Sequence, residues 1–386
     1  MAKSKMAGTI LTYLKEYGNK SFRELPLNDV DALIFCQFAY LKFDGLVPDV
    51  NFNVPPISMR ELAAHPAREG LFADERYEKV NRELFEGMVR GERFGSLRLN
   101  GYVNLIEREW ETQFSAITCE LEDGSFFLAF RGTDESIVGW REDCNMSFLN
   151  PIPSQRCALK YCNMVMERWK GRYYLGGHSK GGNLAVYAAM NCRAAVRERI
   201  ERIYNMDGPG FRPEIQKKGA YDEIRDRIKK ILPHSSFIGM LFEQNTDYSV
   251  VESKSIGLFQ HNPYSWIVEG DHFVKADDVY ESRKFMDQTI NEWLLSLSEE
   301  ELRGFITTLF SILEASHAQN LIELGEDKKK SMLAMAEAMK EVNPETAQMM
   351  GKVLQRLFEI AGTRALREIN EKINRTWKQL GVEKRN

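Results

Sequence analysis

Residues 173–190 constrain the fold of this chain more than any other segment. An apolar run at 173–175 leads into Gly-His-Ser-Lys-Gly at 177–181, and helix-forming residues follow from 183 to 190. Gly-x-Ser-x-Gly between a strand and a helix is typical of a nucleophile elbow, a strained turn that lifts the serine hydroxyl clear of a β-sheet. A glycine-rich turn that only closes a βα unit would show the same glycines. The flanking pattern favours the elbow, with Ser179 as the nucleophile.

The order of elements around the elbow predicts an α/β protein. Strand-like and helix-like segments alternate between residues 125 and 252, which predicts a mostly parallel sheet with helices on both faces. Together with the elbow, this predicts an α/β-hydrolase-like fold. The expected strands lie at 114–121, 125–130, 172–175, 202–206, 228–232 and 248–252. Glu122-Asp123-Gly124 joins the first two as an antiparallel hairpin. The expected helices between the strands lie at 154–170, 183–193 and 213–227.

Helices are also expected on both sides of the alternating region. In the N-terminal part they lie at 6–17, 32–41 and 72–92, with residues 44–70 as a proline-containing loop. After residue 282, Met, Leu, Ala, Glu and Lys recur at spacings of three and four residues, which predicts three or four amphipathic helices. We therefore expect an α/β-hydrolase-like domain at 1–282 and a helical extension at 283–386.

The composition excludes several classes of function. With 52 Lys and Arg residues against 56 Asp and Glu residues, the net charge is −4, which gives no general attraction to nucleic acid. The six cysteines show neither a Cys-x-x-Cys pair nor the spacing of a metal site. We therefore expect free thiols in a reducing cytoplasm, with no metal and no cofactor. No segment has the apolar core of a signal peptide or the roughly 18 apolar residues of a membrane span.

A serine hydroxyl needs a neighbouring base, usually a histidine that a carboxylate orients. In α/β-hydrolases the acid and then the histidine follow the nucleophile along the chain. His261 lies in a loop after the last expected strand, which is the usual place for the base, and His272 is the alternative. His234 stands where an acid is usual, and His317 lies in the expected helical extension.

Two aspartates are candidates for the acid. Asp207 ends the strand that follows the elbow helix, and the turn at 208–210, Gly-Pro-Gly, would fix its carboxylate. Asp247 lies just before the strand that leads to His261. A carboxylate at the carboxyl end of a strand can point across the edge where Ser179 is expected, which favours Asp207. The alternative for Asp207 is an Asx-type turn that satisfies local N–H groups.

The oxyanion of a tetrahedral intermediate needs two backbone N–H donors. Lys180, directly after the nucleophile, should supply one of them. Thr133 or Asp134 should supply the other, because the loop that contains them follows an earlier strand. The Arg131 side chain is expected to brace this loop through an ion pair, with Asp143 as its partner.

These motifs resemble those of known lipases. Residues 128–136, with Trp140 and Asp143 behind them, resemble the Phe-Arg-Gly-Thr segment of class 3 lipases. The resemblance implies oxyanion donors there and a nucleophile in the Gly-His-Ser-x-Gly elbow. The turn at 207–211 is similar to the acid-bearing turn of pancreatic-type lipases, which implies Asp207 as the acid. Residues 20–282 also resemble a bacterial lipase-like family of unknown function, whose elbow reads Gly-His-Ser-Lys-Gly-Gly-Asn.

The chain departs from the class 3 pattern at two places. Lys180 stands where most lipases have a small or apolar residue after the serine. His234-Ser235-Ser236 stands where the class 3 acid segment is usual. The elbow and the oxyanion segment therefore carry over from the resemblance more directly than the acid and the base.

The sequence thus predicts a serine hydrolase, an esterase or lipase-like enzyme that cleaves an acyl or lipid-like ester through an acyl-enzyme on Ser179. Acyl transfer to another acceptor would use the same residues. A non-catalytic hydrolase-fold module is the alternative from another class, in which the helical extension would contact a protein or a membrane surface. The expected partner is a small-molecule ester, and no nucleic acid is expected.

Overall fold

The computed structural model describes residues 8–73, 77–107, 109–134, 137–216, 219–243, 247–276, 279, 281–314, 342, 344–350 and 352. The chain divides into two compact units, Met1–Met146 with Asn150–Tyr280 and Ser147–Leu149 with Glu281–Asn386. The boundary was expected after residue 282, and residues 147–149 were not expected in the second unit.

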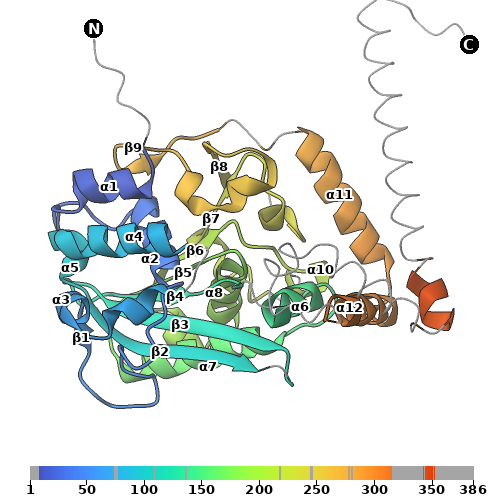
Figure 1. The fold of residues 1–386 in the computed structure, drawn as a ribbon, viewed down its shortest axis with the longest axis horizontal. Coiled ribbons are helices and arrows are strands. Elements are labelled where there is room, and N and C mark those ends of the chain that lie inside the picture. Colours follow the sequence, from blue (N-terminus) through green and yellow to red (C-terminus); the bar gives the residue numbers. More distant parts are fainter. Residues whose placement is uncertain are drawn as a thin grey trace, which may run out of the picture. The chain divides into compact units, whose positions relative to one another are not determined.

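An eight-stranded sheet forms the centre of the described part of the first unit (Figure 1). Its strands are β1 (Ile57–Ser58), β2 (Arg98–Glu107), β3 (Thr112–Glu120), β4 (Phe126–Phe130), β5 (Tyr173–His178), β6 (Ile200–Met206), β7 (Ile228–Pro233) and β8 (Tyr248–Val251). Their order in the sheet is their order in the chain. β1 to β4 pair antiparallel, and β4 to β8 pair parallel. The predicted α/β-hydrolase-like fold with its mostly parallel sheet is confirmed.

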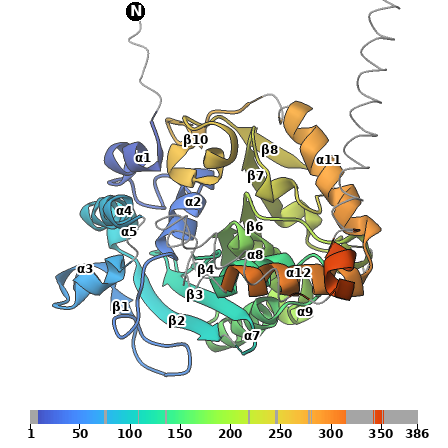
Figure 2. The same ribbon diagram turned by 45° about the vertical axis from the view of Figure 1, so that its right-hand side comes forward.

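Helices cover both faces of this sheet. The longer ones are α1 (Ile10–Tyr17), α2 (Asp29–Phe38), α4 (Glu78–Arg90), α6 (Ile137–Asn145), α7 (Pro153–Arg168) and α8 (Lys180–Asn191). α7 and α8 connect parallel strands that advance in one direction, so right-handed crossovers place both on the same face. α1, α2 and α4 lie on the opposite side of the sheet from α7 (Figure 1 and Figure 2).

Short elements complete the first unit. They are the helices α3 (Met59–Ala64), α5 (Glu92–Gly95), α9 (Ala194–Arg197) and α10 (Pro213–Gln216), the 3₁₀ turns η1 (Arg68–Phe72), η2 (Arg225–Arg227), η3 (Ile238–Met240), η4 (Gly257–His261) and η5 (Pro263–Ser265), and a small hairpin of β9 (Val268–Glu269) and β10 (His272–Phe273).

Strand β4 shows why both faces need helices. All five of its residues are apolar and buried. Side chains alternate across a strand, so Phe127 and Ala129 join the core beneath α2, while Phe126, Leu128 and Phe130 join the core beneath α7 and α8. A strand that is apolar on both faces is typical of the centre of a covered sheet.

Three sequence expectations about elements were wrong. Strand β2 was not predicted, because Gly101 at φ 64° and a register shift between Asn100 and Val103 interrupt its alternation. The expected loop at 44–70 contains β1, α3 and part of η1. The expected helix at 213–227 is reduced to α10 and η2, and between them Gly219 adopts a φ of 72° that an α-helix does not permit.

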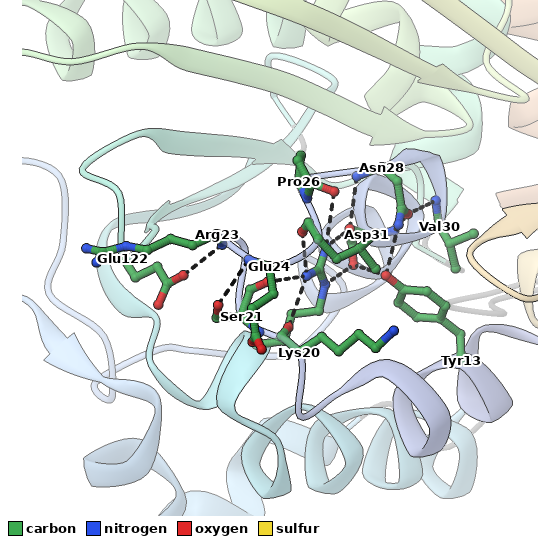
Figure 3. Close-up of polar contacts among 12 residues, drawn as sticks. Tyr13, Lys20, Ser21, Arg23, Glu24, Pro26, Asn28, Val30, Asp31 and Glu122 are labelled. Carbon is green, nitrogen blue, oxygen red and sulfur yellow. Dashed lines mark hydrogen bonds and ion pairs between the residues drawn. The ribbon is translucent and has the colours of Figure 1, made fainter.

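A buried ion pair holds the N-terminal helices together. Arg93 in α5 donates to Asp31 in α2 from Nε to Oδ1 at 2.7 Å and from Nη2 to Oδ2 at 2.5 Å, and both side chains are fully buried. Arg93 also donates to the carbonyls of Lys20, Ser21, Leu25 and Pro26. Asp31 accepts further bonds from the Tyr13 hydroxyl and the Asn28 N–H (Figure 3). This network fixes the 20–28 segment against α2.

We expect Arg93→Met to lower the free energy of unfolding by about 3–5 kcal/mol, because it leaves the Asp31 carboxylate buried without its partner. Arg82→Met is the matched control, since Arg82 forms exposed ion pairs with Glu69 and Glu78 and should cost no more than about 1 kcal/mol. Urea unfolding of both variants measures the difference. A loss at position 93 no larger than that of the control would mean that the network is structurally neutral.

The described part of the second unit consists of helices and short non-helical segments such as Ser147–Leu149. α11 (Glu281–Ser296) and α12 (Glu299–Glu314) meet at Leu297 and Leu302, which are buried, and the partly buried Phe148 and Met349 pack against them. Residues 344–350 are helical, which agrees with the amphipathic helices expected after residue 282. The recurring methionines Met332, Met335 and Met339 of the expected amphipathic helices lie outside the described residues. Among the residues that the structure describes, no helix is both long and apolar enough to cross a membrane.

Candidate active site

Ser179 stands in a strained turn between β5 and α8. Its backbone lies at φ 57° and ψ −133°, a region that serine rarely adopts, and its N–H donates to the Met206 carbonyl at 2.9 Å. The chain passes itself closely here, because a Cβ built on Gly177 would lie 2.2 Å from the carbonyl carbon of Gly181. Only glycine fits at that position. The strand, turn and helix that the sequence predicts are therefore present, and Ser179 precedes the first turn of a 12-residue helix.

Asp207 and His261 form a pair across the carboxyl edge of the sheet. His261 Nδ1 and Asp207 Oδ2 are 2.7 Å apart, the Asp207 side chain is fully buried, and that of His261 is 31% exposed. Asp207 follows β6 and has a φ of 51°. Outside glycine, positive φ angles in the described residues occur only at Ser179, Asp207, Glu111 and Phe242. Backbone strain of this kind gathers at functional sites because the surrounding structure must hold it in place.

The second oxygen of Asp207 is also paired. The Ser236 hydroxyl donates to Asp207 Oδ1 at 2.5 Å, and the same hydroxyl accepts from the Gly239 N–H at 3.1 Å. Ser236 belongs to the segment after β7, where the class 3 pattern would place the acid. In this chain that segment supports a carboxylate that comes from the preceding strand.

The turn that follows Asp207 is also hydrogen-bonded to helix α8. Asn183 Nδ2 donates to the carbonyls of Pro209 at 3.2 Å and Gly210 at 3.0 Å, and Asn183 Oδ1 accepts from Gln155 at 2.8 Å. Asn183 is fully buried. The last residue of the elbow sequence therefore holds the turn that fixes Asp207.

The structure places the alternative residues elsewhere. His272 is 69% exposed and contacts its own neighbour Asp271. Asp247 is exposed at the start of β8. His234 is buried and contacts Glu252 at 3.3 Å and Gln260 at 2.6 Å, so it stabilises the loop before His261. His317 lies outside the described residues.

His261 reaches the elbow beside His178, and the centroids of the two rings are 4.5 Å apart. Between the Ser179 hydroxyl and the His261 imidazole, both within the described residues, the structure has no hydrogen bond. Bonds between nucleophile and base are often long in free enzymes and shorten when substrate binds. The structure thus brings Asp207 and His261 into contact and places them beside the turn that carries Ser179.

The segment at 132–134, which was expected to supply an oxyanion donor, lies directly beside the turn at His178 and Ser179. A Cβ built on Gly132 would lie 2.5 Å from the His178 carbonyl oxygen and 3.2 Å from Ser179 Cβ, so Gly132 permits this close approach. Arg131 does brace the segment, but its ionic partner is Asp134 at 3.5 Å, and it also donates to Asn104. The expectation that Asp143 would pair with Arg131 was wrong.

Asp143 instead joins the side chain of Lys180. Lys180 Nζ lies 2.9 Å from Glu142 Oε2 and 3.5 Å from Asp143 Oδ1, and it is almost completely buried. Asp143 accepts from the Thr133 hydroxyl at 2.5 Å. Gln113 forms a second bridge, accepting from Lys180 at 2.9 Å and donating to the Gly132 carbonyl at 3.4 Å. The lysine that departs from the usual lipase pattern therefore ties the elbow to the segment at 132–134.

Glu142 and Gln113 were not expected from the sequence as partners of Lys180. The useful signal was the lysine itself, since a buried ammonium requires carboxylate partners. Glu142 is fully buried and also accepts from the backbone N–H groups of Gln113 and Ser154. Burial lowers the pKa of Lys180, but Glu142 and Asp143 outweigh this effect and raise it overall, so the side chain stays charged.

Asp143 should make the free energy of unfolding depend on pH. Burial raises the pKa of Asp143 to about 6, although Lys180 and the Thr133 hydroxyl act to lower it. In an unfolded chain the pKa of aspartate is about 3.9, so between about pH 4 and pH 6 the folded protein binds the proton more tightly. The contribution of Asp143 to the free energy of unfolding should therefore fall as the pH rises through this window and stay constant above it.

We expect the stability of the wild type relative to Asp143→Asn to decline from pH 4.5 to about pH 6.5. Urea unfolding of both proteins at four pH values measures it. Every other titratable group occurs in both proteins, so its contribution cancels in the difference between their free energies of unfolding. If the stability of the wild type relative to Asp143→Asn instead rose with pH in this range, the fold would favour the ionised form of Asp143 over the protonated form.

Parts of this chain match one family model and several solved structures. A family model described as Mbeg1-like matches residues 88–311. Among solved structures, M37 lipase is 14% identical over 55% of this chain and 70% of that chain, with a TM-score of 0.37. A triacylglycerol lipase with a serine protease triad as its catalytic centre is 10% identical over 58% of this chain and 80% of that chain, with a TM-score of 0.33. No curated protein sequence matches. The strand order and the strand–turn–helix at Ser179 define the fold of this chain.

Proposed function

The chain belongs to the Mbeg1-like family, and we propose that it is a serine hydrolase that cleaves an acyl ester through an acyl-enzyme on Ser179. The observation that carries the proposal is the buried Asp207 carboxylate 2.7 Å from His261 Nδ1, beside a serine held at positive φ. A carboxylate on Nδ1 leaves Nε2 of the neutral imidazole free to accept a proton.

The proposed reaction has two halves. Ser179 Oγ attacks the ester carbonyl carbon and passes its proton to His261 Nε2, and Asp207 stabilises the imidazolium that forms. The carbonyl oxygen takes up the negative charge and accepts bonds from the N–H of Lys180 and from that of Thr133 or Asp134. Collapse of this intermediate expels the alkoxide, which takes the proton from His261. Water then repeats the sequence on the acyl-enzyme and releases the acid.

An acyl or lipid-like substrate is supported by the loop that carries the base. Ile256 is 80% exposed and Phe259 is 75% exposed, only five and two residues before His261. Exposed large apolar residues beside a site suit an apolar ligand. The class 3 lipase resemblance of the segment at 128–136 and of the elbow points to the same chemical class.

A chain-length panel of p-nitrophenyl esters, from acetate to palmitate, tests this function. The wild type should hydrolyse at least one member, and Ser179→Ala should hydrolyse none above the background. Ile256→Ser with Phe259→Ser should lower the rate on long chains more than on acetate. Absence of turnover across the panel, in protein shown to be folded, would remove the esterase assignment.

The setting of the enzyme is part of the proposal. All six cysteines are free thiols, which suits the reducing cytoplasm. The helices after residue 281 are proposed to contact a protein or a membrane surface and to contribute nothing to the chemistry. The rate of p-nitrophenyl acetate hydrolysis should therefore not change when a protein or a membrane surface binds to the second unit.

A further inference from the structure

Beyond the three residues of the proposed triad, the elbow contains a second histidine with a complete set of partners. His178 is 6% exposed. Its Nε2 lies 2.9 Å from the main-chain carbonyl oxygen of His261, and its Nδ1 lies 3.2 Å from the Tyr40 hydroxyl. One imidazole thus links the segment after α2 to the loop that carries the general base.

The partners determine where the protons of this imidazole lie. A carbonyl oxygen only accepts, so Nε2 of His178 carries a proton and donates it to His261. Burial, and then the nearby His261, lower the pKa of His178 well below its usual range, so the ring is neutral. Nδ1 therefore has a free lone pair, and the Tyr40 hydroxyl donates to it. Tyr40 can do so at any ordinary pH, because burial raises the pKa of its hydroxyl.

Tyr40 itself has little freedom to move away. A Cβ built on Gly132 would lie 2.2 Å from the Tyr40 hydroxyl oxygen, which places that hydroxyl directly against the oxyanion segment. The same oxygen lies 3.5 Å from the His178 carbonyl. The hydroxyl is therefore confined between Gly132 and His178.

His261 is consequently held at two points. Asp207 holds its ring at Nδ1, and His178 holds its main chain at the carbonyl. Among the described residues, the other contacts of this loop act on Gln260, whose carbonyl accepts from Trp266 Nε1 at 2.8 Å, and not on His261 itself. Without the bond from His178, the His261 main chain could therefore shift and carry Nε2 away from Ser179. A base that is misplaced by about 1 Å can lose roughly a hundredfold in rate.

We propose that His178 is a positioning residue for the general base, and that Tyr40 fixes the tautomer in which His178 does this. The inference rests on the proposed function, because it assigns His261 as the base. The two residues do not touch the reacting atoms. They act by holding the loop at 257–261 in register with the elbow.

The test compares His178→Phe, which removes both bonds, with His178→Gln, whose amide N–H can still donate to the His261 carbonyl. On a short p-nitrophenyl ester, His178→Phe should lower kcat by about 10- to 100-fold with KM within about twofold of the wild type. His178→Gln should recover most of the loss. Tyr40→Phe should cost several-fold in kcat, whereas the matched hydroxyl deletion Tyr174→Phe should cost nothing.

A readout that does not depend on turnover is the low-field proton NMR signal of the His261 Nδ1–H that faces Asp207. It should shift or broaden in His178→Phe and return toward the wild-type position in His178→Gln. A folded His178→Phe protein with wild-type kcat and an unchanged signal would overturn the inference. Should His178→Phe fail to fold, an unchanged kcat and an unchanged signal in Tyr40→Phe overturn it instead.

Failure of this inference is separable from failure of the proposed function. If the wild type lacks esterase activity, the function is wrong, and the NMR signal alone decides whether His178 positions the Asp207–His261 pair. If the wild type is active and Ser179→Ala is not, the function stands, and equal rates for the two His178 variants and the wild type would remove only the positioning role.

Discussion

Ser179→Ala should lower kcat/KM for ester hydrolysis by roughly 10⁴- to 10⁶-fold while the protein remains folded. The loss is large because no other group can form the acyl-enzyme. The fold should survive, since alanine at a φ of 57° is strained no more than serine. Steady-state rates on a short soluble ester, with circular dichroism and a melting temperature, measure both parts.

Ser311→Ala is the matched control, because Ser311 is an exposed serine of α12 whose hydroxyl contacts only the helix backbone. It should retain full activity. Retention of more than about a tenth of the wild-type rate by Ser179→Ala would contradict the mechanism and move the nucleophile elsewhere.

His261→Ala should cost nearly as much as Ser179→Ala, because members of a triad act as a unit and their losses do not add. The double variant Ser179→Ala with His261→Ala should therefore be no slower than Ser179→Ala alone. Asp207→Asn should cost roughly 10⁴-fold in kcat, because an amide cannot stabilise the imidazolium and favours the wrong tautomer.

His272→Ala and Asp247→Asn are the controls for this pair of assignments. The His272 side chain is 69% exposed and Asp247 is exposed, so both variants should keep nearly all of the wild-type rate. If the control variants were crippled while His261→Ala and Asp207→Asn stayed active, the base and acid would belong to the later positions.

The sequence predicted the elements that carry their own local signals. The elbow could be predicted because glycine spacing, an apolar strand and a helix-forming run agree at 173–190. The hairpin of β3 and β4 had an Asp-Gly turn, and the parallel strands had short stretches rich in apolar residues between helix-forming segments. The fold class followed from their alternation, which depends on short-range patterns alone.

What could not be predicted depends on contacts between distant segments. The pairing of strand β2 with β3 is interrupted by a register shift between Asn100 and Val103. The pairing of Lys180 with Glu142 joins residues 38 positions apart, and the link from Tyr40 to His178 spans 138 positions. Local sequence patterns do not indicate which residues far apart in the chain will be in contact. Asp207 and Asp247 could be ranked from the sequence, but only the fold shows which carboxylate contacts His261.

Reaction with a labelled fluorophosphonate tests the central claim most directly, since the reagent modifies only a serine that a neighbouring base activates. The proposed function predicts close to one adduct per chain, located on Ser179 by peptide mapping. It also predicts no adduct in Ser179→Ala and a strongly slowed reaction in His261→Ala. A folded wild-type protein that stays unlabelled, or that is labelled on another serine while Ser179 remains free, would contradict it.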